Sequence, residues 1–309
     1  MIDMFNYHGM SITSFILMLI RYPRLIYKSN KSGRKIIKAF SSNNLPYEIP
    51  KYNNKMNFCD SKERYLRSTR LCKSTDENII AMANKLGSNI LPPRKYVEAA
   101  FEFVRNSIEI RFVPIRGAKE TLKTGYGICH DQTCLFIALC RSAGIPARYK
   151  IYRLKGYQQP FRQVIEEENE TQLINGLSIL ASMAVLAEVN VDGKWIICDV
   201  ITSQEASVSS NTPIVQFGED FTQWAIGTPL SIRHVEELPF RMVFISNIAL
   251  KMLNGIFDGH IRVSFDKFLE KGRKKIGNRT LNEIEIKEYN KKAMKSYNLL
   301  LPLDVKKGD

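Results

Sequence analysis

A single segment of this chain joins a glycine-rich turn to an apolar helix. It reads Gly125-Tyr-Gly-Ile-Cys-His-Asp-Gln-Thr-Cys-Leu-Phe-Ile-Ala-Leu-Cys-Arg-Ser-Ala-Gly-Ile-Pro-Ala-Arg148. Apolar residues recur at helical spacing after the first cysteine, which predicts a helix from about 129 to 143. The Gly-Ile-Pro that follows ends this helix, because proline cannot continue a helix and glycine favours its end. Cys129 is therefore expected at the first helical position.

A thiol at a helix start lies near the positive end of the helix dipole and near unpaired backbone N–H groups. Both favour the thiolate, which predicts a lowered pKa for Cys129. The same N–H groups could hold an oxyanion as an attacked carbonyl becomes tetrahedral. Gly125 and Gly127 are expected to allow a tight turn and close approach of a substrate. Cys129 is thus a candidate nucleophile, although on helix position alone a buried structural cysteine is the more common case.

The other cysteines are interpreted as structural. The six stand at positions 59, 72, 129, 134, 140 and 198, without a C-x-x-C pair and without histidines at zinc-finger spacing. This pattern predicts no metal site, and no cofactor is expected. The first apolar run, Phe15 to Ile20, is too short to span a bilayer, and Asp3 stands where a signal peptide carries positive charge. The protein is therefore expected to be cytoplasmic, with Cys134 and Cys140 as reduced core thiols.

Two strands are expected at 183–191 and 194–200, joined by the hairpin turn Asp192-Gly193. A two-residue turn places side chains 184, 186, 188, 197 and 199 on one face of the hairpin. Asp199 then lies diagonally across from residue 184, within reach of a long side chain there. A thiolate nucleophile needs a base and an orienting group, and a histidine at 184 would complete a Cys-His-Asp arrangement. Residue 184 is alanine.

Helices are expected to precede the strands, which favours an α+β fold over a doubly wound sheet. The expected helices lie at 76–86, 95–107 and 119–123, before a strand at 147–154. Residues 157–180 form a polar, acid-rich insertion without a clear period, and residues 202–213, rich in Ser and Thr, are interpreted as a loop. Helical patterns return around Phe268 and over 282–299.

The net charge of +14 is carried by the two ends of the chain. Residues 1–57 hold nine basic and two acidic residues, residues 58–266 hold 24 and 23, and residues 267–309 hold twelve and six. We therefore expect a basic N-terminal segment, a neutral central domain and a basic helical C-terminal segment. Nucleic acid is a disfavoured partner, because no known motif and no interleaving of aromatic and basic residues supports it.

The N-terminal segment is expected to contain amphipathic helix. Ile12, Phe15, Ile16 and Leu19 recur at helical spacing, and residues 21–38 carry seven basic residues and no acid. Such a helix could contact a membrane surface or a partner protein. Packing of its apolar stripe onto the main domain is the favoured interpretation.

The segment 125–148 resembles the nucleophile segment of the transglutaminase-like superfamily. Glu188-Val-Asn-Val-Asp-Gly-Lys-Trp-Ile-Ile-Cys-Asp199 resembles the His-to-Asp hairpin of that family, and residues 118–124 also suit it. The resemblance covers about residues 75–202. It implies a papain-like α+β core with an antiparallel sheet packed on the nucleophile helix, Cys129 as nucleophile and Asp199 as the orienting acid.

The family places its histidine at position 184, where this chain has Ala184. Loss of the base should cost several orders of magnitude in rate. One alternative is a substitute base: His130, His234 or Glu188. The ring of His130 is expected to point away from Cys129, about 100° around the helix, and His234 is placed in a loop. Another is that the insertion at 157–180 shifts the alignment, and a third is a degenerate domain that binds without catalysis.

The resemblance implies acyl transfer through a cysteine thioester, from an amide or thioester donor to an amine or water. Bacterial members of this size include homologues that form amide bonds on carrier proteins in antibiotic assembly lines. Carrier proteins are acidic, so the basic ends would complement such a partner. The sequence therefore yields two hypotheses: a transglutaminase-like acyltransferase or amidase, and a transglutaminase-fold binding module.

Overall fold

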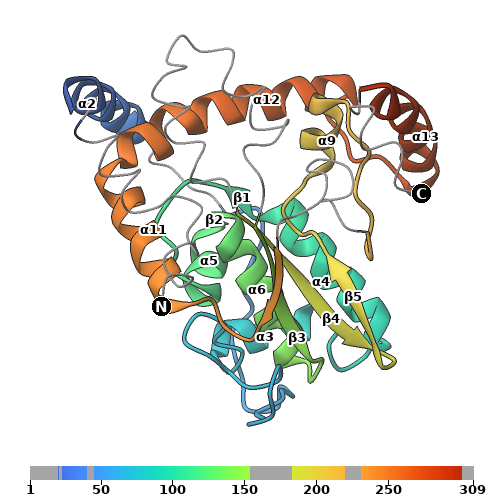
Figure 1. Ribbon diagram of the computed structural model, residues 1–309. Helices are drawn as coiled ribbons and strands as arrows, with labels where there is room; N and C mark the ends of the chain where they lie inside the picture. Colours follow the sequence, from blue (N-terminus) through green and yellow to red (C-terminus); the bar gives the residue numbers. More distant parts are fainter. Residues whose placement is uncertain (1–19, 21–22, 40–44, 154–182, 220–230, 301–309) are drawn as a thin grey trace.

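A central buried helix packed on an antiparallel sheet forms the core of this α+β protein (Figure 1). The computed structural model describes residues 20, 23–39, 45–153, 183–219 and 231–300. The expected apolar repeat at 12–19 and the expected insertion at 157–180 lie outside these residues.

The sheet has four strands in the order β5-β4-β3-β6, all antiparallel to their neighbours. Their bounds are β3 Ala147–Arg153, β4 Met183–Val191, β5 Lys194–Cys198 and β6 Ser231–Val235. One face of β4 carries Val185, Ala187 and Val189, which are fully buried against helix α6 (Cys129–Ser142). The expected α+β class, with its sheet packed on the nucleophile helix, is confirmed.

The β4–β5 hairpin has the expected turn and register. Asp192 and Gly193 both have positive φ, 53° and 77°, as the two central positions of a type I′ turn require. Val191 pairs with Lys194 across this turn. The alternation of β4 therefore places Ala184 on the face opposite to the one that contacts α6.

Three helices pack around α6 on the side away from the sheet. They are α3 Glu77–Lys85, α4 Pro93–Ser107 and α5 Ala118–Thr124. Asp76 accepts a hydrogen bond from the backbone N–H of Asn78 and so caps α3, and Pro93 occupies the first turn of α4. These helices match the expected ones within two residues. The sequence did not predict the short parallel pair β1 (Glu109–Ile110) and β2 (Tyr126–Gly127).

The interpretation of residues 202–213 as a loop is wrong, because helix α9 (Gln204–Ser210) lies there. Ser203 caps it by accepting a hydrogen bond from the N–H of Ala206, so one of the serines that suggested a loop instead starts a helix. The helix packs against α12 (Arg262–Lys275) at Gly272, where an added Cβ would lie 2.0 Å from the carbonyl oxygen of Glu205. Tertiary packing therefore stabilises this helix.

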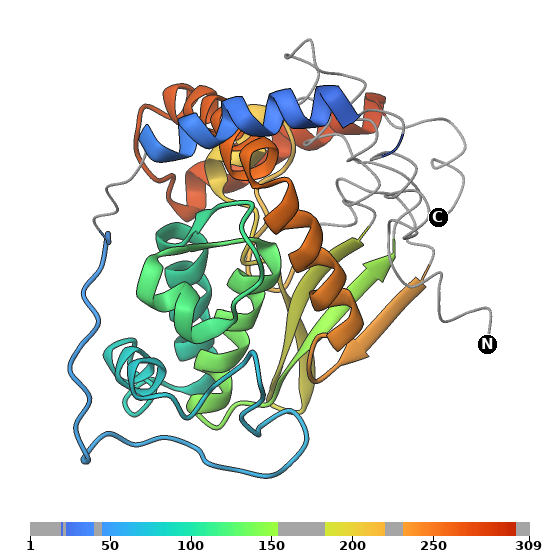
Figure 2. The ribbon, with the colours of Figure 1, turned by 90° about the vertical axis from the view of Figure 1, so that its left-hand side faces the viewer.

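Both ends of the chain contribute to a second helical layer (Figures 1 and 2). Besides α12 it contains α2 Pro23–Ala39, α11 Phe240–Met252, the π-helix η3 Gly255–Ile261 and α13 Glu283–Leu300. The expected helices around Phe268 and over 282–299 are confirmed. Within the described ranges no single helix is long and apolar enough to cross a membrane, although α11 and the helix from Gly255 to Lys275, bent by 71°, meet that test together.

Helix α2 lies on η3 through glycines. A Cβ at Gly33 would lie 1.8 Å from the carbonyl oxygen of Gly255, and one at Gly259 would lie 2.6 Å from that of Gly33. Asn30 fixes the crossing, since its Nδ2 donates to the carbonyl of Met252 and its Oδ1 accepts from the N–H of Gly255. The N-terminal basic helix therefore packs on the C-terminal helices.

Candidate active site

Cys129 and His130 form a contact pair at the start of α6. The Nδ1 atom of His130 lies 3.2 Å from the Sγ atom of Cys129. The expectation that this ring points away is wrong. No preceding turn lies beside the first two residues of a helix, so their side chains can turn back toward one another across the helix end.

The environment of the pair suppresses charge on both groups. Burial raises the pKa of the Cys129 thiol from 9.0 to about 12. The backbone N–H groups of His130 and Cys129 lower this pKa, and the charges of Asp131 and Asp199 raise it. Burial also lowers the pKa of His130 from 6.5 to about 4. The expected lowering of the thiol pKa is therefore wrong: the helix start acts in the expected direction, but desolvation outweighs it.

Asp131 organises the turn that precedes the nucleophile helix, a role that the sequence reasoning missed. Its Oδ1 accepts hydrogen bonds from the backbone N–H groups of Arg116 and Gly117, at 2.9 and 2.8 Å. Its Oδ2 lies 3.4 Å from the N–H of Ile128. Burial raises the pKa of this carboxyl to about 6, and these N–H groups oppose the rise. An acid at the third position of a helix is a capping signal that could have been recognised.

The glycines of the turn have structural uses. Gly125 ends α5 with a left-handed φ of 74°. A Cβ at Gly127 would lie 2.5 Å from the Cβ of Asp131. The absence of a side chain at Gly127 therefore makes room for the side chain of Asp131.

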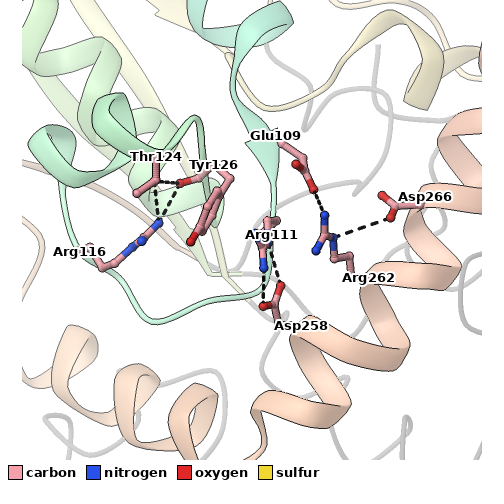
Figure 3. A network of polar contacts seen from close by, with 8 residues as sticks. All are labelled: Glu109, Arg111, Arg116, Thr124, Tyr126, Asp258, Arg262 and Asp266. Carbon is pink, nitrogen blue, oxygen red and sulfur yellow. Dashed lines mark hydrogen bonds and ion pairs between the residues drawn. The ribbon is translucent and has the colours of Figure 1, made fainter. Parts of the chain in front are cut away.

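Two arginines flank the ring of Tyr126 in this turn (Figure 3). The guanidinium carbons of Arg111 and Arg116 lie 4.0 and 4.6 Å from the ring centroid. The backbone N–H of Arg111 also donates to the carbonyl of Gly127. The segment just before Cys129 is therefore fixed from both sides.

The same network attaches the turn to the C-terminal helices (Figure 3). Arg111 makes two hydrogen bonds to Asp258 of η3, at 3.0 and 2.7 Å, and both residues are buried. Arg262 of α12 lies 2.9 Å from Glu109. The helical layer is thus joined to the core directly beside the nucleophile turn.

Asp199 lies at the end of β5 and is completely buried. Its charge raises the pKa of Cys129, so the two groups are within electrostatic range. The carboxylate itself faces the following turn, where it accepts hydrogen bonds from the N–H of Ile201 and from the N–H and Oγ1 of Thr202. Burial raises the pKa of Asp199, and these donors oppose the rise.

Comparison with known families matches residues 80–200, which contain this site, to the transglutaminase-like superfamily. Residues 80–200 form a transglutaminase-like domain. A solved structure described as "a Putative Cysteine Protease from Cytophaga hutchinsonii" is 25% identical over 44% of this chain and 40% of its own length, with a TM-score of 0.33. No curated protein matches this chain.

The transglutaminase-like domain has an apolar group at the position of the family histidine. Ala184 pairs with Tyr152 of β3 and packs with Tyr152 and Leu186. The neighbouring strand position is tied to the nucleophile helix, since Thr133 Oγ1 donates to the carbonyl of Val185 at 3.0 Å. The strand is therefore held beside the first turns of α6, without a base at residue 184.

His234, the other histidine considered as a substitute base, interacts with Glu188 in the structure. It lies in strand β6, so its expected placement in a loop is wrong. Its Nε2 is 3.4 Å from Glu188, which also pairs with Arg148 and Lys150. β6 and β5 are opposite edges of the sheet, so His234 and Asp199 lie about 14 Å apart across three strand spacings.

Cys134 and Cys140 are fully buried, as expected. Burial raises the pKa of both thiols, which keeps them protonated. Among the described residues, no group of three or more His, Cys, Asp or Glu side chains could hold a metal ion. Of the titratable groups suggested by the sequence, the structure brings Cys129 and His130 into contact, with Asp199 within electrostatic range of the thiol.

Proposed function

We propose that the transglutaminase-like domain performs acyl transfer through a thioester on Cys129, with His130 as the base. The observation that carries this proposal is the 3.2 Å contact between Sγ of Cys129 and Nδ1 of His130 at the start of α6. His130 would thus act in place of the family histidine, whose position is occupied here by Ala184.

The pKa values of the pair oppose proton transfer before the attack, so the proton has to move as the bond to the acyl carbon forms. A thiol with a pKa of about 12 beside an imidazole with a pKa of about 4 is a neutral pair at neutral pH. As Sγ forms a bond to the acyl carbon, its proton passes to Nδ1, which requires the tautomer with hydrogen on Nε2. The tetrahedral intermediate then expels an amine or thiol, which takes this proton. An amine or water then attacks the resulting thioester, its proton passes through Nδ1 of His130 to Sγ as the C–S bond breaks, and Cys129 is released as the thiol.

The start of the helix supplies groups for the developing oxyanion. The backbone N–H groups of Cys129 and His130 already interact favourably with a charge at Sγ. Donors fixed in the backbone need no reorganisation as charge moves from sulfur to the carbonyl oxygen. The amide or thioester donor, the amine acceptor and the acidic carrier protein expected from the sequence remain predictions.

The proposal is tested by acylation with small activated donors. The full chain is incubated with p-nitrophenyl acetate and with acyl thioesters of N-acetylcysteamine, and acylation is followed by intact mass. We expect one added acyl group, absent in Cys129→Ala and formed about a hundredfold or more slowly in His130→Ala. His234→Ala is the matched control, since that ring is bound to Glu188 at the far edge of the sheet, and it should react like the native chain. Equal rates in His130→Ala and His234→Ala would contradict the role of His130.

A second candidate is a binding module that uses the same fold without catalysis. The observation in its favour is the apolar packing of Ala184 together with an Asp199 carboxylate that faces its own turn. Ala184→His separates the two functions, because it restores the histidine that the family has at this position. A native chain that forms no adduct, together with an Ala184→His chain that does, would favour the binding module.

A further inference from the structure

Helix α11 carries a row of apolar side chains that face solvent. Phe240, Phe244, Ile248 and Met252 follow at intervals of four residues and are 64%, 54%, 40% and 47% exposed. The rings of Phe240 and Phe244 stack with centroids 5.9 Å apart. The opposite side of α11 is buried through Met242, Val243, Ala249 and Leu250. The helix is therefore apolar on both faces, which is unusual for a helix at a water-exposed surface.

Helix α2 places positive charge beside this row. Its exposed basic side chains are Arg24, Lys28, Lys31, Arg34, Lys35 and Lys38. Neither α2 nor α11 contains an acidic residue. The bond from Asn30 to the carbonyl of Met252 holds α2 at the C-terminal end of α11, and Figure 2 shows both helices on the side that faces the viewer. We call these exposed side chains of the two helices the α2–α11 face.

Further cations lie along α11 itself. Arg241 and Lys251 are exposed at its two ends, and the guanidinium of Arg70 lies 5.4 Å from the centroid of the Phe240 ring. On α2, Tyr27 is 67% exposed and lies beneath Lys31. The face therefore combines aromatic and aliphatic side chains with a surrounding set of lysines and arginines.

We propose that the α2–α11 face docks on an anionic membrane surface. Apolar side chains in a row along one helix can enter the boundary between headgroups and acyl chains, while the adjacent cations bind anionic headgroups. A lipid surface adapts to a row of side chains and needs no matching groove. The charge of the face selects anionic over neutral lipid, because each lysine near the surface contributes roughly a fivefold gain in partitioning.

Docking through this face has a consequence for the acyl-transfer site. The face lies on the helical layer that Arg111 and Asp258 join to the nucleophile turn. Membrane attachment would therefore hold the domain at the surface through this helical layer. The inference does not depend on the acyl-transfer proposal, because it uses other residues.

The proposal is tested by co-sedimentation of the full chain with sucrose-loaded vesicles. Vesicles of phosphatidylcholine alone are compared with vesicles that also contain phosphatidylglycerol. We expect the chain to sediment only with the vesicles that contain phosphatidylglycerol. The bound fraction should decrease as salt is raised, because the Debye length shortens. Absence of sedimentation with anionic vesicles at low salt would overturn the proposal. Binding to soluble polyglutamate without binding to vesicles would also overturn it, and would point to an acidic protein instead.

Two sets of variants test whether the α2–α11 face is the part of the protein that binds the vesicles. The first set removes apolar side chains. Phe244→Ser combined with Ile248→Ser should lower partitioning at least tenfold, since the apolar area that enters the membrane is lost. The matched control replaces two other exposed isoleucines, Ile90→Ser with Ile284→Ser, and should bind like the native chain.

The charge variants replace lysines by glutamine. Lys28, Lys31 and Lys35 of α2 are changed together, with an expected loss of about a hundredfold. The matched control changes the exposed Lys51, Lys55 and Lys62, which lie outside the face. Equal losses in the α2 set and the control set would show that net charge, and not this face, determines binding, and would overturn the proposal.

Discussion

The thiol and imidazole at the start of α6 lie in contact, and burial determines their charge. A helix N-terminus favours a thiolate, and the N–H groups of Cys129 and His130 act in that direction. Removal of water from the thiol acts in the opposite direction and is the larger effect. The family arrangement has a histidine on a strand, whereas here the imidazole is on the adjacent residue and is itself partly buried.

The charge states of this pair give a prediction at the scale of single residues. The pKa of Cys129 is raised to about 12 and that of His130 is lowered to about 4, so both groups should stay neutral between these values. Ultraviolet absorbance of the thiolate, measured as the difference between the native chain and Cys129→Ala, should show no step from about pH 5 to pH 9. A step near neutral pH would indicate a preformed thiolate–imidazolium pair and would contradict the neutral pair.

At the scale of elements, glycines decide where helices cross. Gly33 and Gly255 allow the backbones of α2 and η3 to approach until a Cβ has no room. Gly272 does the same where α12 meets α9. Close backbone approach brings side chains such as Asn30 within hydrogen-bonding distance of carbonyl groups on the neighbouring helix. These crossings bind the N-terminal helix and α9 to the C-terminal helices.

The crossing of α2 and η3 predicts that a Gly→Ala substitution lowers stability, which is the opposite of its usual effect in a helix. Gly→Ala inside a helix normally stabilises by about 0.5–1 kcal/mol. Gly33→Ala should instead destabilise by about 1–3 kcal/mol, because its Cβ would lie 1.8 Å from the carbonyl oxygen of Gly255. Chemical denaturation measures the change, and hydrogen exchange should show loss of protection in α2. Lys31→Ala, at an exposed position of the same helix, is the control and should not lose stability.

At the scale of the whole molecule, the transglutaminase-like domain and the helical layer meet at a polar interface. The transglutaminase-like domain contributes Arg111 and Glu109, and the helical layer contributes Asp258 and Arg262 (Figure 3). Burial lowers the pKa of Arg111, and the hydrogen bonds and charge of Asp258 offset this and raise it, so the guanidinium stays charged. The buried charge of Arg111 in this interface needs the carboxylate of Asp258 as its partner.

Loss of that partner should therefore destabilise the whole chain. Asp258→Ala leaves the guanidinium of Arg111 buried without its acid, and we expect a loss of about 3–5 kcal/mol in the free energy of unfolding. Replacing both residues, as Arg111→Met with Asp258→Leu, should recover most of this loss, because two apolar groups need no pairing. Urea denaturation of the three variants measures the effect. A double variant no more stable than Asp258→Ala would show that this interface contributes to stability by something other than charge pairing.

The core elements could be predicted from the sequence, since they depend on local patterns. The apolar period after Cys129, the Gly-Ile-Pro stop and the Asp192-Gly193 turn predicted α6, the hairpin and its register. Together with the family resemblance they also gave Cys129 and Asp199 as candidate site residues and showed that the family histidine is replaced by Ala184. Helix α9 was missed because serine-rich composition favours loops, whereas its cap and its packing on α12 stabilise it.

The charge states at the site and the position of the basic helix α2 depend on the tertiary structure. Solvent access set the pKa values of Cys129 and His130, and burial depends on everything that packs around a group. Contacts between distant segments placed His234 on Glu188 and α2 on η3. Charge and motif are local properties that a sequence carries, whereas desolvation and proximity arise only when distant parts of the chain meet.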